Sequence, residues 1–246
     1  MSFTKRNQEP SKMGDENKNF ALNLNKFSFN FNDAVSTNHK AGNIVSSPFS
    51  VFTTLAMLGV GANNATKRQI LQAMGLKDDN ITPLVERMGE LYQNLTSDST
   101  STTLSVANNI WMDQRTTVLE RFHGDVSKHF GVDIGRTDFN NNAESARKTI
   151  NRWVEQRTSE KITELFSSGS IASTTELVLA NAVYFKGAWK EQFDAQDTSQ
   201  FDFFLDQEES VKVDFMFRHD KMATGYDPTY NLQLLKLPHA GTHTFC

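Results

Sequence analysis

The chain has 246 residues, a formal net charge of −4 and a single cysteine, Cys246. Its hydrophobic content of 38% is that of a folding soluble chain, and its length allows one sizeable core. The scattered lysines and arginines argue against a nucleic-acid footprint, and one cysteine excludes an internal disulfide and a cysteine-based metal cluster. We therefore expect one globular unit that is stabilised by packing and holds no metal or other cofactor.

The beginning of the sequence is polar. Residues 1–19 lack the apolar core and small-residue cleavage site of a signal peptide, and later apolar stretches such as 177–183 are too short to span a bilayer. The sequence thus predicts a polar tail over 1–19, a folded domain over 20–246, no membrane contact and a cytoplasmic location. An extracellular location is the alternative if the true N-terminus lies upstream or if export is unconventional.

Apolar spacing and capping signals predict a series of helices in the first two thirds of the chain. Apolar residues from Phe20 to Phe31 recur at three- and four-residue intervals. Ser47 and Pro48 form a cap-and-proline start for a buried helix that should end at Gly59 or Gly61. Further helices are predicted where Asn64 would cap a segment stopped by Gly75, after Thr82-Pro83, and over residues 119–130 and 143–154.

Strand patterns occur in the middle of the chain and dominate its last quarter. Alternation over 104–112 predicts a strand with one buried face, and the nearly continuous apolar run 177–185, interrupted by Asn181, predicts a central strand covered on both faces. Shorter strands are predicted at 132–134, 201–203, 211–215 and 230–234. This order of helices and strands indicates an α+β fold built on a large sheet.

Three segments carry a resemblance to a known family. They are NIVSSPFS (43–50), INRWV (150–154) followed by Thr158, Lys161, Ile162 and Leu165, and LANAVYFKGAW (179–189). From Phe20 onward, with these segments in family order and spacing, the chain resembles a serpin. The resemblance implies the serpin fold, mixed β-sheets with surrounding helices, and a sequence that stops before the reactive-centre loop. The C-terminal part, including the scissile bond, is therefore expected to be missing.

The resemblance also implies a mechanism and a gating site. In serpins a protease cleaves an exposed loop, which then inserts as a new strand into the main sheet. Insertion requires neighbouring strands to part, so the contacts that hold them should be polar and exchangeable. By resemblance, Ser47, Ser50 and Asn181 form this gating site, the shutter, and Trp189 lies at the breach, where the loop begins to enter. Without the resemblance, Ser47 is simply a helix cap, Asn181 a satisfied buried amide and Trp189 a core aromatic residue.

The resemblance implies a serine-type endopeptidase inhibitor rather than an enzyme. The sequence has no Gly-x-Ser-x-Gly elbow, and its histidines, including His239 and His243, share no catalytic or metal-binding arrangement and are expected at the surface. A full-length parent would have a serine protease as its partner. The chain as written is expected not to trap a protease, and a sheet edge left open beside the strand of Asn181 would favour aggregation or strand pairing. The alternatives are a non-inhibitory binding or chaperone protein and a non-functional truncated isoform.

Overall fold

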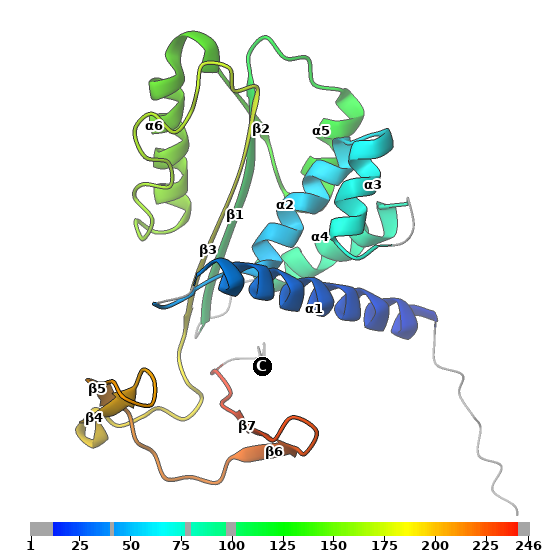
Figure 1. The fold of residues 1–246 in the computed structure, drawn as a ribbon. Coiled ribbons are helices and arrows are strands. Elements are labelled where there is room, and N and C mark those ends of the chain that lie inside the picture. Colours follow the sequence, from blue (N-terminus) through cyan, green and yellow to red (C-terminus); the bar gives the residue numbers. More distant parts are fainter. Residues whose placement is uncertain (1–11, 40–41, 77–79, 97–101, 241–246) are drawn as a thin grey trace, which may run out of the picture. The chain divides into compact units, whose positions relative to one another are not determined.

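A computed structural model describes residues 12–39, 42–76, 80–96 and 102–240 (Figure 1). The helices and the first strands are, in chain order, α1 (Lys12–Asn38), α2 (Pro48–Gly61), α3 (Asn64–Ala73), α4 (Thr82–Thr96), β1 (Thr102–Asp113), α5 (Glu120–Phe130), β2 (Ile134–Thr137), α6 (Phe139–Arg157) and β3 (Leu177–Gly187). A 3-10 turn (Ala195–Asp197) and the strands β4 (Ser199–Phe204), β5 (Ser210–Phe215), β6 (Ala223–Asp227) and β7 (Leu232–Lys236) follow. The predicted α+β class is confirmed.

The described residues form two compact units, where the sequence predicted one. The first lies within Met1–Thr96 and Ser105–Tyr184, and the second within Ser97–Leu104 and Phe185–Cys246. The division arises because the later strands pair locally: β4 pairs with β5 and β6 with β7, each as an antiparallel hairpin. Strand β6 was not predicted, and β2 begins at Ile134, where its predicted range ended.

Helix α1 begins at Lys12, so the predicted polar tail over 1–19 was wrong for residues 12–19. The helix was predicted from Phe20 because apolar spacing begins there. Adding a residue to an existing helix, however, costs far less free energy than starting one. No proline interrupts the segment between Lys12 and Asn38. The helix therefore continues through polar residues that precede its apolar face. None of the helices in the described ranges has the length and hydropathy needed to cross a bilayer.

Helix α3 shows one correct and one incorrect boundary prediction. Its N-cap is Asn63, which makes no side-chain cap hydrogen bond, and Asn64 already starts the helix with φ 50°. Asparagine tolerates this left-handed conformation better than most residues, so the cap lies one position earlier than predicted. At the other end Gly75, with φ 76°, follows the last turn as predicted and donates its N–H to the carbonyl of Gln72 at 3.0 Å.

The core of the first unit is a three-stranded sheet in the order β2-β1-β3. Strands β1 and β2 are parallel, with Ile110 opposite Ile134. Strand β3 runs antiparallel to β1, because Asp113 N donates to Glu176 O at one end and the Asn108 and Asn181 side chains pair farther along. In Figure 1, α6 lies on one side of these strands and α2 to α5 lie on the other.

Apolar clusters cover both faces of this sheet. On one face Phe52 of α2 and Phe130 of α5 belong to the same cluster as Ile110 of β1. On the other face Ile150 of α6 packs in a cluster with Trp111 of β1. The expectation of a single buried face for β1 was therefore wrong, because α6 covers the second face. The Trp111 and Trp153 rings meet edge to face there, with 5.0 Å between their centroids.

Two polar side chains hold the loop that follows α6. The Asn151 side chain accepts hydrogen bonds from the N–H groups of Leu165 and Phe166, at 3.1 and 2.9 Å, and donates to the carbonyl of Phe166 at 2.8 Å. The Thr158 hydroxyl accepts from the N–H of Ile162 at 3.1 Å. These contacts give a reason for the asparagine and the threonine in the serpin-like segment 150–158. The two side chains satisfy backbone groups of the loop that have no partner in a helix or sheet.

The fully buried carboxylate of Asp113 connects the end of β1 to α6. It pairs with Arg115, whose Nε lies 2.6 Å from Asp113 Oδ1, and it accepts from the backbone N–H of Phe139 at 3.1 Å. The side-chain hydrogen bond from Arg115, followed by backbone N–H donors, lowers the pKa of Asp113 from its ordinary value of 3.8 to about 2. The folded chain thus favours the charged carboxylate.

This depressed pKa predicts an acid-dependent loss of stability. Because the folded pKa is below the unfolded one, the stabilisation is present above about pH 4 and is lost as the pH falls through about 2. We expect Asp113→Asn to lower the denaturant midpoint at pH 7, and the gap between variant and original chain to narrow from about pH 4 downward.

The measurement is a series of urea unfolding curves across this pH range, with Asp33→Asn on the exposed face of α1 as the matched control. The control should follow the original chain. A gap between the Asp113 variant and the original chain that stays constant with pH would contradict the assignment.

Candidate functional site

Ser47 and Ser50 lie together at the start of α2. The Ser47 hydroxyl oxygen accepts a hydrogen bond from the backbone N–H of Ser50 at 3.4 Å, and Pro48 occupies the first turn. Both serines are half-buried. The predicted cap is therefore confirmed. Among the described residues the Ser50 hydroxyl makes no hydrogen bond of its own, so it is available to a partner that approaches this helix end.

Asn181 pairs with an asparagine on the neighbouring strand. Its Nδ2 donates to Oδ1 of Asn108 on β1. Leu177 and Leu179 pack in the cluster on the α2 side of the sheet, so the alternation of β3 places Asn181 on that same face. The structure thus brings the Asn108–Asn181 pair and the start of α2 to one side of the sheet.

One amide atom of each residue in the Asn108–Asn181 pair has no hydrogen-bond partner among the described residues. Nδ2 of Asn108 and Oδ1 of Asn181 are both buried and unpaired. A buried polar atom without a partner costs about 1–3 kcal/mol, so this pair is held by one hydrogen bond while it carries two unmet ones. Such a contact changes partners more readily than an apolar seam does.

The structure joins only part of the predicted set. Ser47 and Ser50 are hydrogen-bonded to each other, but no hydrogen bond between either serine and Asn181 occurs in the part of the chain described. The expectation that Asn181 is a fully satisfied amide was wrong, because its Oδ1 has no partner. Sequence reasoning assigned no role to Asn108. The sequence feature that could have identified Asn108 is its polar side chain at an inward-facing position of the alternating strand 104–112.

Trp189 belongs to the second unit, where it stacks on His239. The ring centroids are 4.5 Å apart, with an interplanar angle of 10°. The two residues also form an antiparallel bridge, supported by hydrogen bonds from Lys190 N to Pro238 O at 2.9 Å and from Ala240 N to Ala188 O at 2.8 Å. The structure therefore places Trp189 in an aromatic contact with a segment about fifty residues away in sequence.

His239 is not the surface histidine that the sequence predicted. It is half-buried, and Phe185 packs edge to face against it with centroids 5.2 Å apart. A Cβ at Gly187 would lie 2.6 Å from Nδ1 of His239, so this close approach requires the glycine. His243 lies outside the described residues. Within those residues, no three His, Cys, Asp or Glu side chains are grouped so that they could hold a metal ion.

Comparison with protein families decides what kind of protein carries this geometry. A family model described as Serpin (serine protease inhibitor) matches residues 22–246. The chain belongs to the serpin family. The family is described as one of inhibitors, which agrees with the prediction that the chain is not an enzyme.

Curated relatives agree with this assignment. The serpin "Leukocyte elastase inhibitor" of Xenopus tropicalis is 34% identical over 223 residues, which cover 90% of this chain and 59% of the relative. The human protein of the same name is 35% identical over 212 residues, which cover 85% of this chain and 54% of the relative. The chain thus spans less than two thirds of the length of these relatives.

Solved serpin structures confirm the expected fold. The structure described as "Cleaved Serpin 42Da" superimposes with a TM-score of 0.84 at 32% identity, over 92% of this chain and 60% of that one. Ovalbumin from the emu, Dromaius novaehollandiae, gives a TM-score of 0.85 at 24% identity, over 92% of this chain and 62% of that one.

The Asn108–Asn181 pair makes a testable prediction about stability. Alanine at either position leaves the other amide buried without its partner, so each single variant should lose about 1–3 kcal/mol of unfolding free energy. The double variant should lose less than the sum of the two, by about 0.5–1.5 kcal/mol.

Urea unfolding of the four chains measures this coupling. A parallel cycle of Asn181→Ala with Asn140→Ala, an exposed asparagine on α6, should be additive. Additive losses in the Asn108–Asn181 cycle would show that the hydrogen bond does not couple the strands.

Proposed function

We propose that this chain is the sheet-bearing part of a serine protease inhibitor that acts by inserting a cleaved loop into the sheet of β1 and β3. The observation that carries the proposal is the serpin match over residues 22–246, and the relatives named as elastase inhibitors support it. An elastase-type serine protease is the first target to consider.

In this proposal the free edge of β3 receives the inserted strand. Strand β3 is the last in the order β2-β1-β3 within the described residues. Residues 1–246 then supply the receiving edge and the gate, and do not trap a protease by themselves. The same edge would pair with another chain when no inserted strand covers it.

Ser47, Ser50 and Asn181 form the gate in this proposal, with Asn108 as a fourth member. Two features support it: the unpaired hydroxyl of Ser50 at the start of α2, and the unpaired amide atoms of Asn108 and Asn181. A strand that parts from β3 exchanges polar contacts at small cost where contacts are already incomplete. Trp189 marks the entry point for the loop, and its stacking on His239 would have to accommodate that entry. The cytoplasmic location stays a prediction.

A protease panel tests the proposal. Residues 1–246 should be cleaved by serine proteases without a covalent complex on a denaturing gel. A chimera in which the remaining C-terminal part of human leukocyte elastase inhibitor follows Ala240 should form a denaturation-resistant complex with an elastase, because it combines the receiving sheet with a bait loop.

The control is the same chimera incubated with an elastase whose catalytic serine has been inactivated. No complex should form, since the bond that persists is an acyl link to that serine. The chimera must first show a single cooperative unfolding transition. A folded chimera that is only cleaved would argue against an inhibitory sheet. A complex with residues 1–246 alone would overturn the division of roles.

A further inference from the structure

Arg218 joins two irregular connections within the second unit. It lies in residues 216–222, between β5 and β6, and its side chain is 15% exposed. Its Nη1 donates to the carbonyl of Glu191, and its Cζ lies 5.1 Å from the centre of the Phe193 ring. Glu191 and Phe193 belong to the connection that follows β3. One side chain therefore contacts both a backbone group and a ring of that connection.

The carboxylate of Asp220 does not hold this guanidinium by a hydrogen bond. Asp220 Oδ2 lies 3.7 Å from Nε of Arg218, and Nε is buried without a hydrogen-bond partner among the described residues. A charge-assisted hydrogen bond between such groups spans about 2.7–2.9 Å. The contacts with Glu191 and Phe193 are therefore the ones that orient the Arg218 side chain.

The connection that Arg218 contacts carries Trp189. The Phe193 and Trp189 rings meet edge to face, with 6.2 Å between their centroids and an interplanar angle of 73°. Trp189 in turn stacks on His239. The side-chain contacts thus form one series that runs from Arg218 through Phe193 and Trp189 to His239.

The backbone contact between Trp189 and His239 is small. It is an isolated bridge, and its two hydrogen bonds are donated by the N–H groups of Lys190 and Ala240. Such N–H groups exchange with solvent through local opening, whose free energy lies below that of global unfolding. A side chain that holds the segment after Trp189 in place should therefore determine how often this bridge opens.

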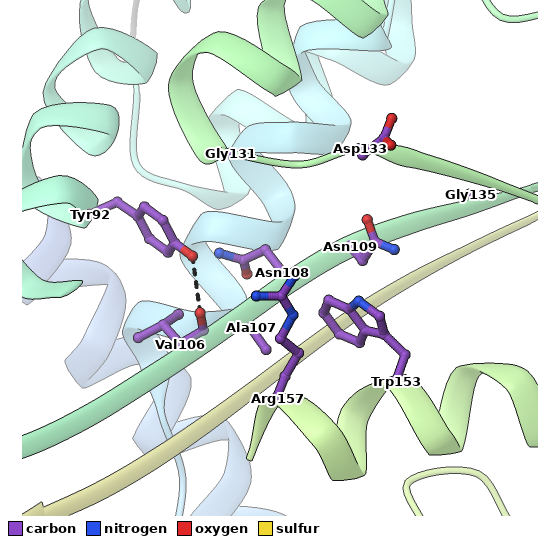
Figure 2. A pocket seen from close by; sticks show the side chains of 10 residues that line it. All are labelled: Tyr92, Val106, Ala107, Asn108, Asn109, Gly131, Asp133, Gly135, Trp153 and Arg157. Carbon is purple, nitrogen blue, oxygen red and sulfur yellow. Dashed lines mark hydrogen bonds between the residues drawn. The ribbon is translucent and has the colours of Figure 1, made fainter. Parts of the chain in front are cut away.

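A second arginine that lies over an aromatic ring shows what distinguishes Arg218. The Arg157 guanidinium is 5.8 Å from the centre of the Trp153 ring, and Figure 2 shows both side chains on α6. These residues are four positions apart on one helix, so their contact is local and constrains no distant segment. Arg218 instead reaches a carbonyl 27 residues away in sequence.

We propose that Arg218 is a positioning residue that keeps the bridge between Trp189 and His239 closed. Its hydrogen bond holds the backbone at Glu191, and its cation holds the Phe193 ring against the indole. The functional meaning of the bridge rests on the proposed function, in which the inserted loop enters at Trp189. Arg218 then sets how often that entry point opens.

Amide hydrogen exchange of residues 1–246, followed by two-dimensional NMR, tests the proposal without a protease. Arg218→Met removes the charge and the donors and keeps a long unbranched side chain. We expect the Lys190 and Ala240 amides to exchange about fivefold faster, because both a hydrogen bond and a cation–π contact are lost. The reference in the same unit is the Leu205 amide, which donates to Glu209 O at 2.9 Å and should exchange as before.

Two further variants complete the test. Arg218→Lys keeps a cation and a donor but not the planar fork, so the exchange of Lys190 and Ala240 should rise only about twofold. Arg157→Met removes the matched contact on α6 and should leave both amides unchanged.

Unchanged exchange of Lys190 and Ala240 in Arg218→Met, or an equal acceleration of Leu205, would overturn the proposal. If Arg218→Met does not fold, Arg218→Lys decides by the same two criteria. Failure of the chimera to trap an elastase would count against the proposed function alone, because the exchange measurement involves neither the chimera nor a protease.

Discussion

The first unit depends on one constraint: helices cover both faces of β1 and of the first part of β3, so the side chains there must fit between helices. Phe52 and Phe130 fill the space on one face, and Ile150 packs with Trp111 on the other. A polar residue placed between such layers needs a partner within the sheet. Asn181 finds one in Asn108, and among the described residues no second hydrogen bond completes the match between the two amides.

The position of α6 is set by polar contacts at both of its ends. Asp113 binds the first N–H of the helix, at Phe139, while Asn151 and Thr158 hold the loop that follows it. Hydrophobic burial is non-directional, whereas hydrogen bonds require particular partners. The hydrogen bonds therefore fix the register of α6.

Local signals predicted the elements well, whereas pairings between distant segments could not be predicted. The cap at Ser47 and the end of α3 near Gly75 depend on a few adjacent residues, so the sequence contains all the information needed. Asn108 and Asn181 are 73 residues apart, and no periodicity states which residue faces which across a sheet. The stacking of His239 on Trp189 likewise joins residues that are distant in sequence. It could not be predicted for the same reason, so His239 was expected at the surface. The start of α1 was missed because a helix can extend through a sequence that has no apolar periodicity.

The placement of the tryptophans gives the chain an internal set of optical probes. Trp111 and Trp153 are in edge-to-face contact within the first unit, and Trp189 is stacked on an imidazole within the second. Indole emission depends strongly on such neighbours, and a protonated imidazole is an effective quencher of it. The emission of the chain is therefore the sum of two spectroscopically distinct environments, one for each unit, and a chain with phenylalanine at position 189 would report on the first unit alone.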